Sequence, residues 1–587
     1  MTTDLPPASE DTTSVPVKNN HPLRLWPAWW IVIAQVIALI LTVTPSIRNL
    51  PRFIFMMAGP LVTALAFTVW LLFVSRLRWR EKLALVIAGI AFPMISSQIS
   101  DFDDALRTTM WIYGVPLAEL MITLALSIWS QAPRRCLLAV LLLAVGWSSF
   151  ALVRNEGFDG DYYAEFRWRW SPRHEDTLPE LTPQSGGLPE TSEKADAPVN
   201  DLIWSQYRGP EGNGSSVEEI APLDWTTKPP KELWRISIGP GWGSFAYNNQ
   251  KLFTQEQRGE KEHVTCYSAA DGRAIWTHAD ETRFNEVVSG AGPRSTPSVA
   301  NGRVYALGGT GLLTCLKEVD GTVVWQKNLV TDFGAPIPMW GFSSSPLILE
   351  DKLIIFAGGP EKNGLLALEC ATGNTLWGFP STDMNYTTAR PMTLCGQSVV
   401  VFCDSKGTHA IDPKDGSAIW TFKPELWKGP AMVDPQQIGP ESLLVGLGDG
   451  VGTARLEVSK TEERWTVTEA WSSTKLRPSF NDSVVFDNGV YGFNQAIFSC
   501  IDATTGERKW QGGRYGFGQT ILLKRAGQIL VAAENGDLVL LQATPEKLTE
   551  LSRLPMLNDK TWNHPIVADK RLFLRSGKTA VCLQLAE

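Results

Sequence analysis

Tryptophan recurs through the C-terminal two thirds of the chain at a spacing that averages 46 residues. The recurring residues are Trp234, Trp276, Trp325, Trp377, Trp420, Trp465 and Trp510. In five of these units a glycine stands four residues before the tryptophan, in an Asp-Gly or Thr-Gly pair: Gly272, Gly321, Gly373, Gly416 and Gly506. Such pairs favour tight turns between antiparallel strands. A repeat of this length indicates stacked copies of one small structural unit.

The first half of each unit has short alternating apolar runs, as in 297–299 followed by 303–305. With the two strands around the glycine turn, each unit has four short strands, which is typical of a propeller blade. We therefore predict eight blades, at approximately 243–276, 294–325, 343–377, 389–420, 429–465, 477–510, 516–552 and 562–587. The eighth blade lacks an outer strand. Residues Glu232–Ile238, around Trp234, are predicted to supply it and to close the ring.

Cysteines and tryptophans of the repeat have structural interpretations. Cys266, Cys315 and Cys500 each stand six residues before the turn glycine, where other units have Ala367 and Ala410. This pattern indicates a small buried position on the third strand, because free cysteine packs as a small hydrophobic residue. The recurrent tryptophan is interpreted mainly as packing between blades.

Composition excludes several classes of protein. Residues 154–587 carry 53 Asp and Glu against 42 Lys and Arg, and an acidic body argues against a nucleic-acid partner. The eight cysteines include no CxxC and no adjacent pair, which excludes c-type haem attachment and zinc ribbons. No two of the six histidines have metal-ligand spacing, so any metal site would be oxygen-based.

Five apolar stretches in residues 1–153 predict a membrane domain of about five helices. They are Trp26–Thr44, Phe53–Val74, Leu83–Ile99, Thr108–Trp129 and Cys136–Val153. Arginine and lysine gather between the second and third stretches, at 76–82, and between the fourth and fifth, at Arg134 and Arg135. Because short basic loops stay in the cytoplasm, these loops are predicted to be cytoplasmic. The C-terminal region then lies on the extracytoplasmic side of the inner membrane.

Glu119, near the middle of the fourth stretch, is costly to bury and is a candidate functional residue. The alternative is a protonated carboxyl that bonds a neighbouring helix, through Gln35 or Gln98.

Residues 154–200, rich in Pro, Asp, Glu, Gly and Ser, are predicted to link the membrane domain to a propeller over 201–587. The aromatic and basic residues at 166–170 fit either an interfacial anchor or packing against the outer domain.

The G-x-x-x-W phrase from Gly272 to Trp276, with its repeats, resembles the bacterial PQQ-like β-propeller repeat proteins over about residues 201–587. The stretches 204–214 and 253–258 look like a membrane-tethered subgroup of that family. Its quinoprotein dehydrogenases use a vicinal disulfide, a calcium site and an Asp base, and this chain has no vicinal cysteines. Other relatives are noncatalytic scaffolds. The resemblance therefore implies binding as the default, with no cofactor predicted and PQQ in doubt.

Residues just before the inner strands of a propeller converge on one mouth of its channel. The predicted mouth residues are Trp242, Arg294, Trp340, Arg390, Lys475, Tyr515, Gln519, Trp562 and Asn563. They are cationic and aromatic, include no carboxylate, and suit a small anionic or sugar ligand. Alternatively, Arg294 and the others cap a water-filled channel and bond neighbouring carbonyls. For acid–base chemistry the candidates are Glu256, Asp280 and Glu281.

The sequence thus predicts a membrane-anchored extracytoplasmic propeller that binds a protein or a small ligand without catalysis. The alternative is a PQQ- or metal-dependent periplasmic oxidoreductase.

Overall fold

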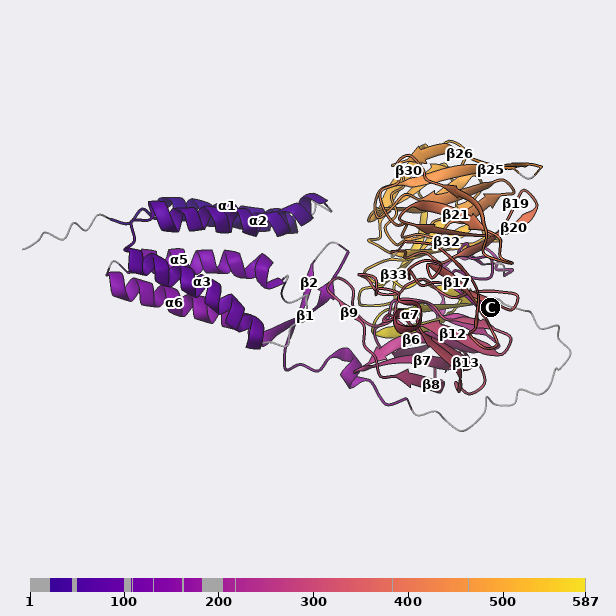
Figure 1. Ribbon diagram of the computed structural model, residues 1–587, viewed down its shortest axis with the longest axis horizontal. Coiled ribbons are helices and arrows are strands. Elements are labelled where there is room, and N and C mark those ends of the chain that lie inside the picture. The colour runs from indigo at the N-terminus through magenta and orange to yellow at the C-terminus, as the bar shows by residue number, and fades with distance from the viewer. Residues whose placement is uncertain are drawn as a thin grey trace, which may run out of the picture. The chain divides into compact units, whose positions relative to one another are not determined.

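The structure is a computed structural model of the whole chain. It describes residues 22–44, 50–99, 107, 109–129, 131–160, 163–181, 204–216, 218–382, 384–462 and 464–585. The chain divides into two compact units (Figure 1). One comprises residues 1–155 with 166–170, and the other comprises 156–165 with 171–587. The predicted linker is therefore divided: 156–165 and 171–181 belong with the propeller, while 182–200 lies outside the described residues.

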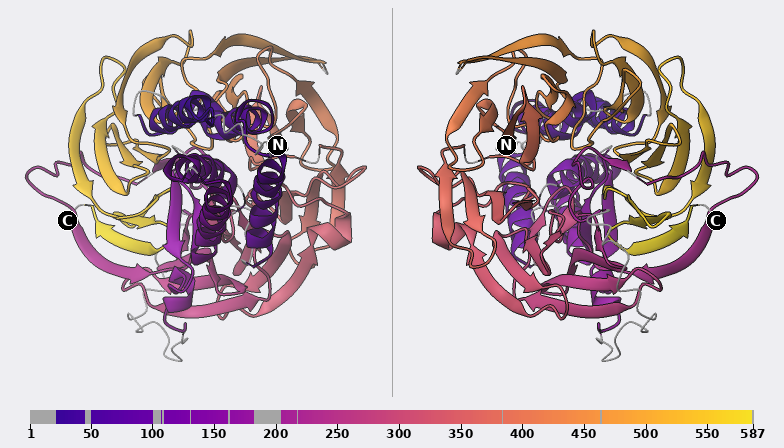
Figure 2. Two further views of the ribbon diagram at one scale, coloured as in Figure 1. Left: turned by 90° about the vertical axis from the view of Figure 1, so that its left-hand side faces the viewer. Right: turned by 90° about the vertical axis from the view of Figure 1, so that its right-hand side faces the viewer.

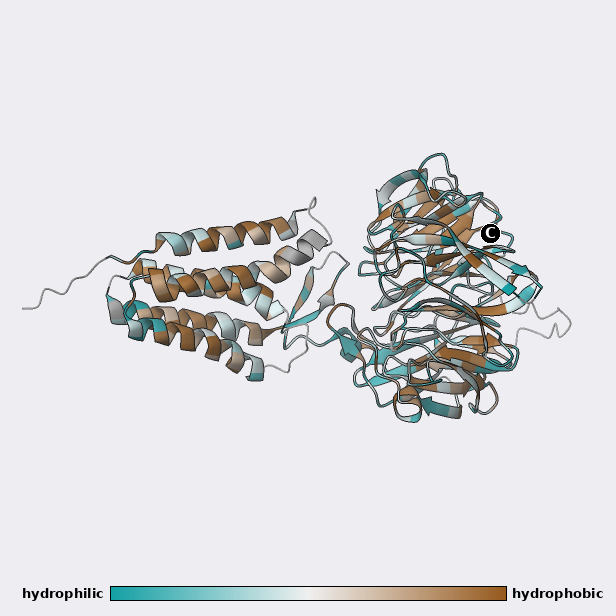
Figure 3. Ribbon diagram, turned by 45° about the horizontal axis from the view of Figure 1, so that its top comes forward, coloured by the Kyte–Doolittle hydropathy of each residue, from teal (hydrophilic) through white to brown (hydrophobic). Residues whose placement is uncertain are grey.

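The first unit is helical. Its elements are α1 (Trp26–Val43), α2 (Leu50–Val69), η1 (Trp70–Val74), α3 (Trp79–Ile99), η2 (Met110–Gly114), α5 (Val115–Ile128), α6 (Ala132–Ser149) and η3 (Phe150–Leu152). Among the described residues, three helical stretches are long and apolar enough to cross a membrane: Phe55–Val74, Met110–Ile128 and Pro133–Leu152. The ribbon of these helices is coloured largely as hydrophobic (Figure 3), and many of their apolar side chains are exposed, such as Leu61, Leu65, Ile128 and Leu141. Such a surface is what lipid would cover.

Of the five predicted spans, three meet the length and apolar composition needed to cross a membrane. The apolar part of α1 is shorter, at Trp26–Thr42. The helix α3 begins with a charged turn in which Glu81 forms a buried ion pair with Arg135, 2.9 Å apart. Asp101, Asp103 and Asp104, in the loop between the third and fourth predicted spans, lie outside the described residues.

The second unit is a ring of eight β-sheets, seen along its axis in Figure 2. Four successive strands form each of the first seven blades, which confirms the predicted blade count and four-stranded units, and β3 (Ser215–Ser216) adds a fifth strand to blade 7. Blades 1 to 4 consist of β5 (Ala246–Asn248), β6 (Lys251–Arg258), β7 (Lys261–Ser268) and β8 (Ala274–Asp280); β11 (Ser298–Ala300), β12 (Arg303–Leu307), β13 (Leu312–Lys317) and β14 (Val323–Asn328); β15 (Leu347–Leu349), β16 (Lys352–Phe356), β17 (Leu365–Glu369) and β18 (Thr375–Phe379); and β19 (Arg390–Leu394), β20 (Gln397–Asp404), β21 (Gly407–Ile411) and β22 (Ala418–Phe422).

Blades 5 to 8 consist of β23 (Gln436–Gly439), β24 (Ser442–Gly446), β25 (Thr453–Thr461) and β26 (Arg464–Ser473); β27 (Val484–Phe486), β28 (Gly489–Asn494), β29 (Ile497–Asp502) and β30 (Arg508–Arg514); β31 (Gln519–Leu523), β32 (Gln528–Ala532), β33 (Asp537–Gln542) and β34 (Glu550–Pro555); and β35 (Ile566–Ala568), β36 (Arg571–Arg575), β37 (Thr579–Gln584) and β4 (Lys231–Ser237). The smaller elements are β1 (Val153–Phe158), β2 (Ala164–Trp168), η4 (His174–Thr177), β3 (Ser215–Ser216), β9 (Asn285–Glu286), β10 (Gly290–Ala291) and α7 (Leu329–Phe333).

The ring is closed by a strand from the start of the propeller. Strand β4 pairs antiparallel with β37, and Trp234 lies opposite Cys582. The last blade is thus completed by the first strand of the ring, as predicted. This pairing leaves β37 without a free edge, which would otherwise invite pairing with another chain.

A tryptophan–glycine contact, which we call the latch, joins most neighbouring blades. The indole of Trp276 donates its N–H to the Glu318 carbonyl of the next blade, at 2.9 Å, and packs on that blade's turn glycine, Gly321. A Cβ added at Gly321 would lie 2.5 Å from the ring. The same glycine has φ near +72°, a conformation that glycine adopts without strain. The packing interpretation of the repeat tryptophans is confirmed.

The latch recurs with the same geometry around the ring. Equivalent contacts join Trp234 to Gly272, Trp325 to Gly373, Trp377 to Gly416 and Trp471 to Gly506. In six of the blades, the third-strand residue opposite the repeat tryptophan is small and buried: Cys266, Cys315, Ala367, Ala410, Cys500 or Cys582. The prediction of small buried third-strand positions is therefore confirmed.

Blade 5 departs from the predicted register. Its latch tryptophan is Trp471, which lies opposite Arg455 and donates to the Ala503 carbonyl at 3.3 Å. The predicted residue, Trp465, lies opposite Lys460 near the end of a long hairpin. The prediction was wrong because β25 and β26 extend beyond the usual length and blade 5 has no turn glycine from which to count. Consistently, the buried indole N–H of Trp420 in blade 4 has no hydrogen-bond partner among the described residues.

Alanine substitutions at two glycines with the same backbone geometry distinguish the stability due to the latch from the cost of backbone strain. Gly302, with φ +70°, has no atom within 4 Å of an added Cβ, unlike Gly321. We expect Gly302→Ala to lower the free energy of unfolding by about 1–2 kcal/mol, the strain of a left-handed residue. Gly321→Ala adds overpacking against Trp276, about 1–3 kcal/mol more. Denaturant unfolding of the full-length protein checks this, and equal losses in the two variants would contradict the latch.

Candidate functional site

Each blade contributes one buried polar side chain just before or at the start of its inner strand. These eight residues, which we call the axial belt, are Ser244, Thr296, Ser345, Thr388, Asp434, Asp482, Gln519 and His564. Backbone N–H groups donate from one blade to the belt side chain of the next: from Ser244 to Thr296 at 2.8 Å, Thr296 to Ser345 at 3.0 Å, Ser345 to Thr388 at 3.0 Å, Thr388 to Asp434 at 2.7 Å, and Asp434 to Asp482 at 2.9 Å. The belt therefore holds the inner strands in a fixed order around the axis.

Two carboxylates of the belt carry buried charge. Arg390 Nε donates to Asp434 Oδ2 at 2.8 Å, and Nη2 of the same guanidinium makes a second, short contact with that oxygen. Asp482 accepts from the hydroxyl of Tyr207 at 3.0 Å and lies 3.5 Å from Arg208. Burial opposes ionisation of Asp482, yet the charge of Arg208 holds the pKa of that carboxyl below its usual range.

The segment 204–216 fills part of the axis. Arg390 donates to the Tyr207 carbonyl at 3.0 Å, and Arg208 donates to the Ser483 carbonyl at 2.6 Å. Gly212 packs so closely on Arg390 that an added Cβ would lie 2.5 Å from its guanidinium. The motif read from the sequence at 204–214 is thus a structural plug that joins distant blades.

The predicted mouth residues do not form one group. Arg390 and Gln519 belong to the axial interior, where Gln519 donates to the Trp562 carbonyl at 3.1 Å. Tyr515 bonds Glu550 of the outer strand β34 at 2.7 Å, and Lys475 is exposed. Asn563 donates to the carbonyls of 241 and 243, which ties blade 8 to blade 1.

Arg294 is also committed to internal bonds. Its guanidinium donates to the carbonyls of Gly290 and Gly292, each at 2.8 Å, and lies 3.5 Å from Glu286. These bonds match the alternative in which Arg294 bonds neighbouring carbonyls and does not face a ligand. The expectation that the ring around the axis lacks carboxylates was wrong, since Asp434 and Asp482 both lie in it. The predicted mouth residues were chosen by their distance along the sequence, and they fall at different positions relative to the inner strands. The belt residues become clear only when the blades are aligned by their strand pairing.

Glu256 lies inside blade 1 and is fully buried. Its carboxylate accepts from Tyr267 at 2.5 Å and from the Gly239 N–H at 2.6 Å, and lies 3.2 Å from Arg258. Burial opposes its ionisation, but the charge of Arg258 and these bonds hold the pKa of Glu256 below its ordinary value. A carboxylate held in this way is a poor general base, because its proton affinity is low and its lone pairs are occupied.

Aromatic rings lie at one end of the channel, in the loops that lead into the inner strands. This aromatic mouth comprises Trp242, Trp340, Tyr386, Phe480, Phe517 and Trp562, and the ring centroids of neighbouring members lie 5.0–6.0 Å apart. Sequence reasoning found the three tryptophans and missed the other three rings. Five of the six stand two positions before the axial belt, so the signal exists once the blades are aligned.

The chain's own segment 156–160 contacts this mouth through its main chain. The Phe158 N–H donates to the Val288 carbonyl at 2.7 Å, and the Gly160 N–H donates to Glu534 at 2.7 Å. Lys560 donates to the Phe158 carbonyl at 2.8 Å and lies over the rings of Trp242 and Trp562, at 4.9 and 4.3 Å. Burial lowers the pKa of Lys560 to about 8.

Comparison with known proteins places the repeat. Residues 260–423 match the family model described as outer membrane protein assembly factor BamB. PQQ-like repeats are thus shown over this part of the propeller. No curated protein matches the chain.

Several solved structures are similar to this chain. BamB from Moraxella catarrhalis is 16% identical, with a TM-score of 0.44, and the match covers 60% of this chain and 97% of that one. A quinohemoprotein alcohol dehydrogenase from Pseudomonas putida HK5 is 11% identical, with a TM-score of 0.40 and coverage of 65% and 80%. The computationally designed Ika8 protein is 9% identical, with a TM-score of 0.43 and coverage of 60% and 99%.

The residues present do not fit PQQ with calcium. All eight cysteines are free and none is adjacent to another. Within the described residues, no group of three His, Cys, Asp or Glu side chains could hold a metal ion. The axial carboxylates Asp434 and Asp482 are instead bonded to Arg390, Arg208 and Tyr207.

The buried pair on the axis predicts a specific stability effect. Arg390→Ala should lower the free energy of unfolding by about 3–5 kcal/mol, because it leaves Asp434 charged, buried and unpaired. The neutral double variant Arg390→Gln with Asp434→Asn should recover part of this loss. Lys475→Ala, at an exposed side chain, should change stability by less than about 0.5 kcal/mol.

Denaturant unfolding of the full-length variants checks these values. An Arg390→Ala protein as stable as the parent would contradict the structural assignment and return Arg390 to the list of free ligand-binding cations.

Proposed function

We propose that the chain is a membrane-anchored, extracytoplasmic binding module that recognises polypeptide at the aromatic mouth and does not catalyse a reaction. One observation carries the proposal: the mouth already holds a stretch of polypeptide, 156–160, through main-chain groups. Lys560 supplies a donor for a carbonyl and Glu534 an acceptor for an N–H. Recognition of main chain between flat rings suits peptides of varied sequence.

The charges near the axis support binding over catalysis. Arg390, Asp434 and Asp482 satisfy one another or the plug segment, and Glu256 is enclosed in its blade. Removing a proton from a substrate requires a base that the substrate can reach. The oxidoreductase alternative has no such group among these residues.

Exposed apolar side chains beside the rings extend the proposed surface. Ile337 is 48% exposed and Met339 is 69% exposed, in the loop that carries Trp340. Trp340 packs on Tyr386 with centroids 5.1 Å apart. Exposed apolar groups around aromatic anchors are characteristic of protein–protein contact surfaces. A protein partner outside the cytoplasm therefore fits this mouth better than the small anionic or sugar ligand.

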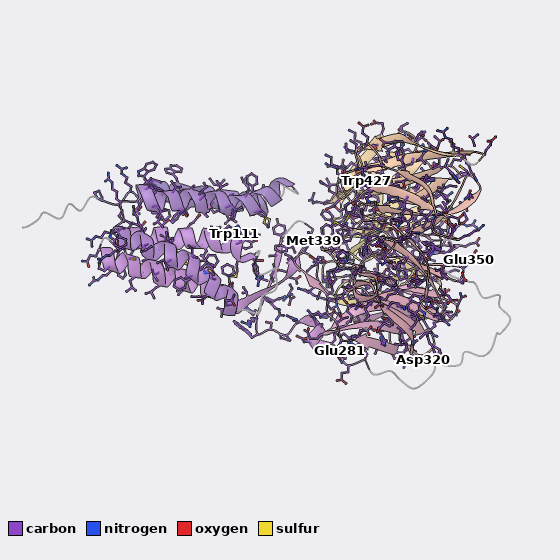
Figure 4. All side chains as sticks on the ribbon, in the orientation of Figure 1. Trp111, Glu281, Asp320, Met339, Glu350 and Trp427 are labelled. Atoms are coloured by element: carbon purple, nitrogen blue, oxygen red, sulfur yellow. The ribbon has the colours of Figure 1, made fainter. Side chains whose placement is uncertain are left out.

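Position-dependent cross-linking tests the binding surface. A photoreactive phenylalanine at Met339 should cross-link to another polypeptide in cells. The same group at Val319, which is apolar and 68% exposed on the rim of blade 2, should not. Glu350, which lies on the opposite face of the propeller from Met339 in Figure 4, is a second control. Equal cross-linking at all three sites, or none at Met339, would contradict the proposal.

Localisation also remains a proposal, resting on the basic loops at 76–82 and at Arg134 and Arg135. Alkaline phosphatase is active only outside the cytoplasm. Fused after Gly160 it should be active, and fused at Arg80 it should be inactive. The reverse pattern would place the propeller in the cytoplasm.

A further inference from the structure

A buried polar cluster lies in the helical unit, where α1, α2 and α5 pack together. Glu119 of α5 is 3% exposed, and neither of its carboxylate oxygens has a hydrogen-bond partner among the residues that the structure describes. Gln35 of α1 is 1% exposed, and its amide nitrogen also has no partner within that part of the chain. Buried polar groups are normally paired, so each of these atoms requires an explanation.

Side-chain bonds place the three helices in register. Thr63 of α2 donates to Gln35 Oε1 at 2.9 Å, and its hydroxyl also faces Glu119. Near one end of the bundle, Trp29 of α1 donates to Ser127 of α5 at 3.2 Å. From that contact, Gln35 is six residues along α1 and Glu119 eight residues back along α5, about 9 and 12 Å at the helical rise. The two side chains therefore lie at similar heights in the bundle.

No ionisable side chain on the three neighbouring helix segments can balance a negative charge on Glu119. Glu119 is the sole ionisable residue in the sequence of α1, α5 and residues 55–69 of α2. Elsewhere in the same unit the buried Glu81 has its arginine, 2.9 Å away. A carboxylate buried without a partner is neutralised by a bound cation or by a proton.

We propose that Glu119, Thr63 and Gln35 form a binding site for one Na⁺-sized monovalent cation, for which a proton competes. The carboxylate, hydroxyl and amide oxygens are hard donors, which suit alkali and alkaline-earth ions. One carboxylate balances a single positive charge, whereas a divalent ion would leave net charge in an apolar bundle. Thr63 can turn its proton to the Pro60 carbonyl, 3.3 Å away, and so free its own oxygen and that of Gln35 for the ion.

Carbodiimide labelling and sodium binding test the site on the full-length protein in detergent. Dicyclohexylcarbodiimide modifies protonated carboxyls in apolar surroundings, and mass spectrometry of the peptide containing Glu119 measures the rate. At fixed pH, NaCl should slow this labelling at least fivefold, and choline chloride at the same concentration should not. Gln35→Leu and Thr63→Val should raise the Na⁺ concentration for half protection at least tenfold.

Equilibrium binding of ²²Na⁺ gives a second readout that does not depend on labelling. One ion should bind per chain in the parent protein and in Ser97→Ala, a change at a half-buried residue of α3, and binding should be lost in Glu119→Gln. Circular dichroism shows whether each variant keeps its helices. A labelling rate that does not change with the Na⁺ concentration would mean that the carboxyl binds only a proton, and it would overturn the proposal. Equal ²²Na⁺ binding by the parent and folded Glu119→Gln would overturn it as well.

Discussion

The contact between a tryptophan of one blade and the turn glycine of the next determines how this propeller is assembled. Trp276 on Gly321 shows the requirement most plainly, because the indole occupies the space that any Cβ would need. The same contact carries a hydrogen bond from the indole N–H to the neighbouring blade. Each latch therefore combines apolar burial with a satisfied polar group, which makes the spacing of blades specific as well as stable.

The fixed spacing of the blades brings their inner strands together, and this accounts for the interior of the ring. The axial belt passes hydrogen bonds from blade to blade, while the plug segment places Tyr207 and Arg208 against Asp482. Charges enclosed in this way contribute to a unique structure, and breaking one pair is costly. The binding surface that we propose is the aromatic mouth, where Lys560 and Glu534 contact main-chain groups of the segment 156–160.

The sequence was sufficient for the architecture because the latch repeats. The eight blades, the closing strand around Trp234 and the small third-strand residues all follow from one spacing. The prediction for blade 5 was wrong because this blade has no turn glycine to fix the register. Trp465 was therefore predicted where the structure has Trp471. The candidate site was harder. The partners of Arg294 and Arg390 come from loops and from the plug segment, and no local pattern shows which charges will meet across the axis. Likewise, the number of apolar stretches predicted the helices but not how many of them meet the length and composition needed to span a membrane.

A double-mutant cycle between Trp276 and Gly321 tests the latch most directly. Unfolding free energies of the full-length parent, Trp276→Leu, Gly321→Ala and the double variant give the coupling between the two residues. The account predicts a coupling of about 1–3 kcal/mol, since Gly321→Ala should cost only backbone strain once the indole is gone. Additive losses would show that the two residues do not act on each other and would contradict the latch.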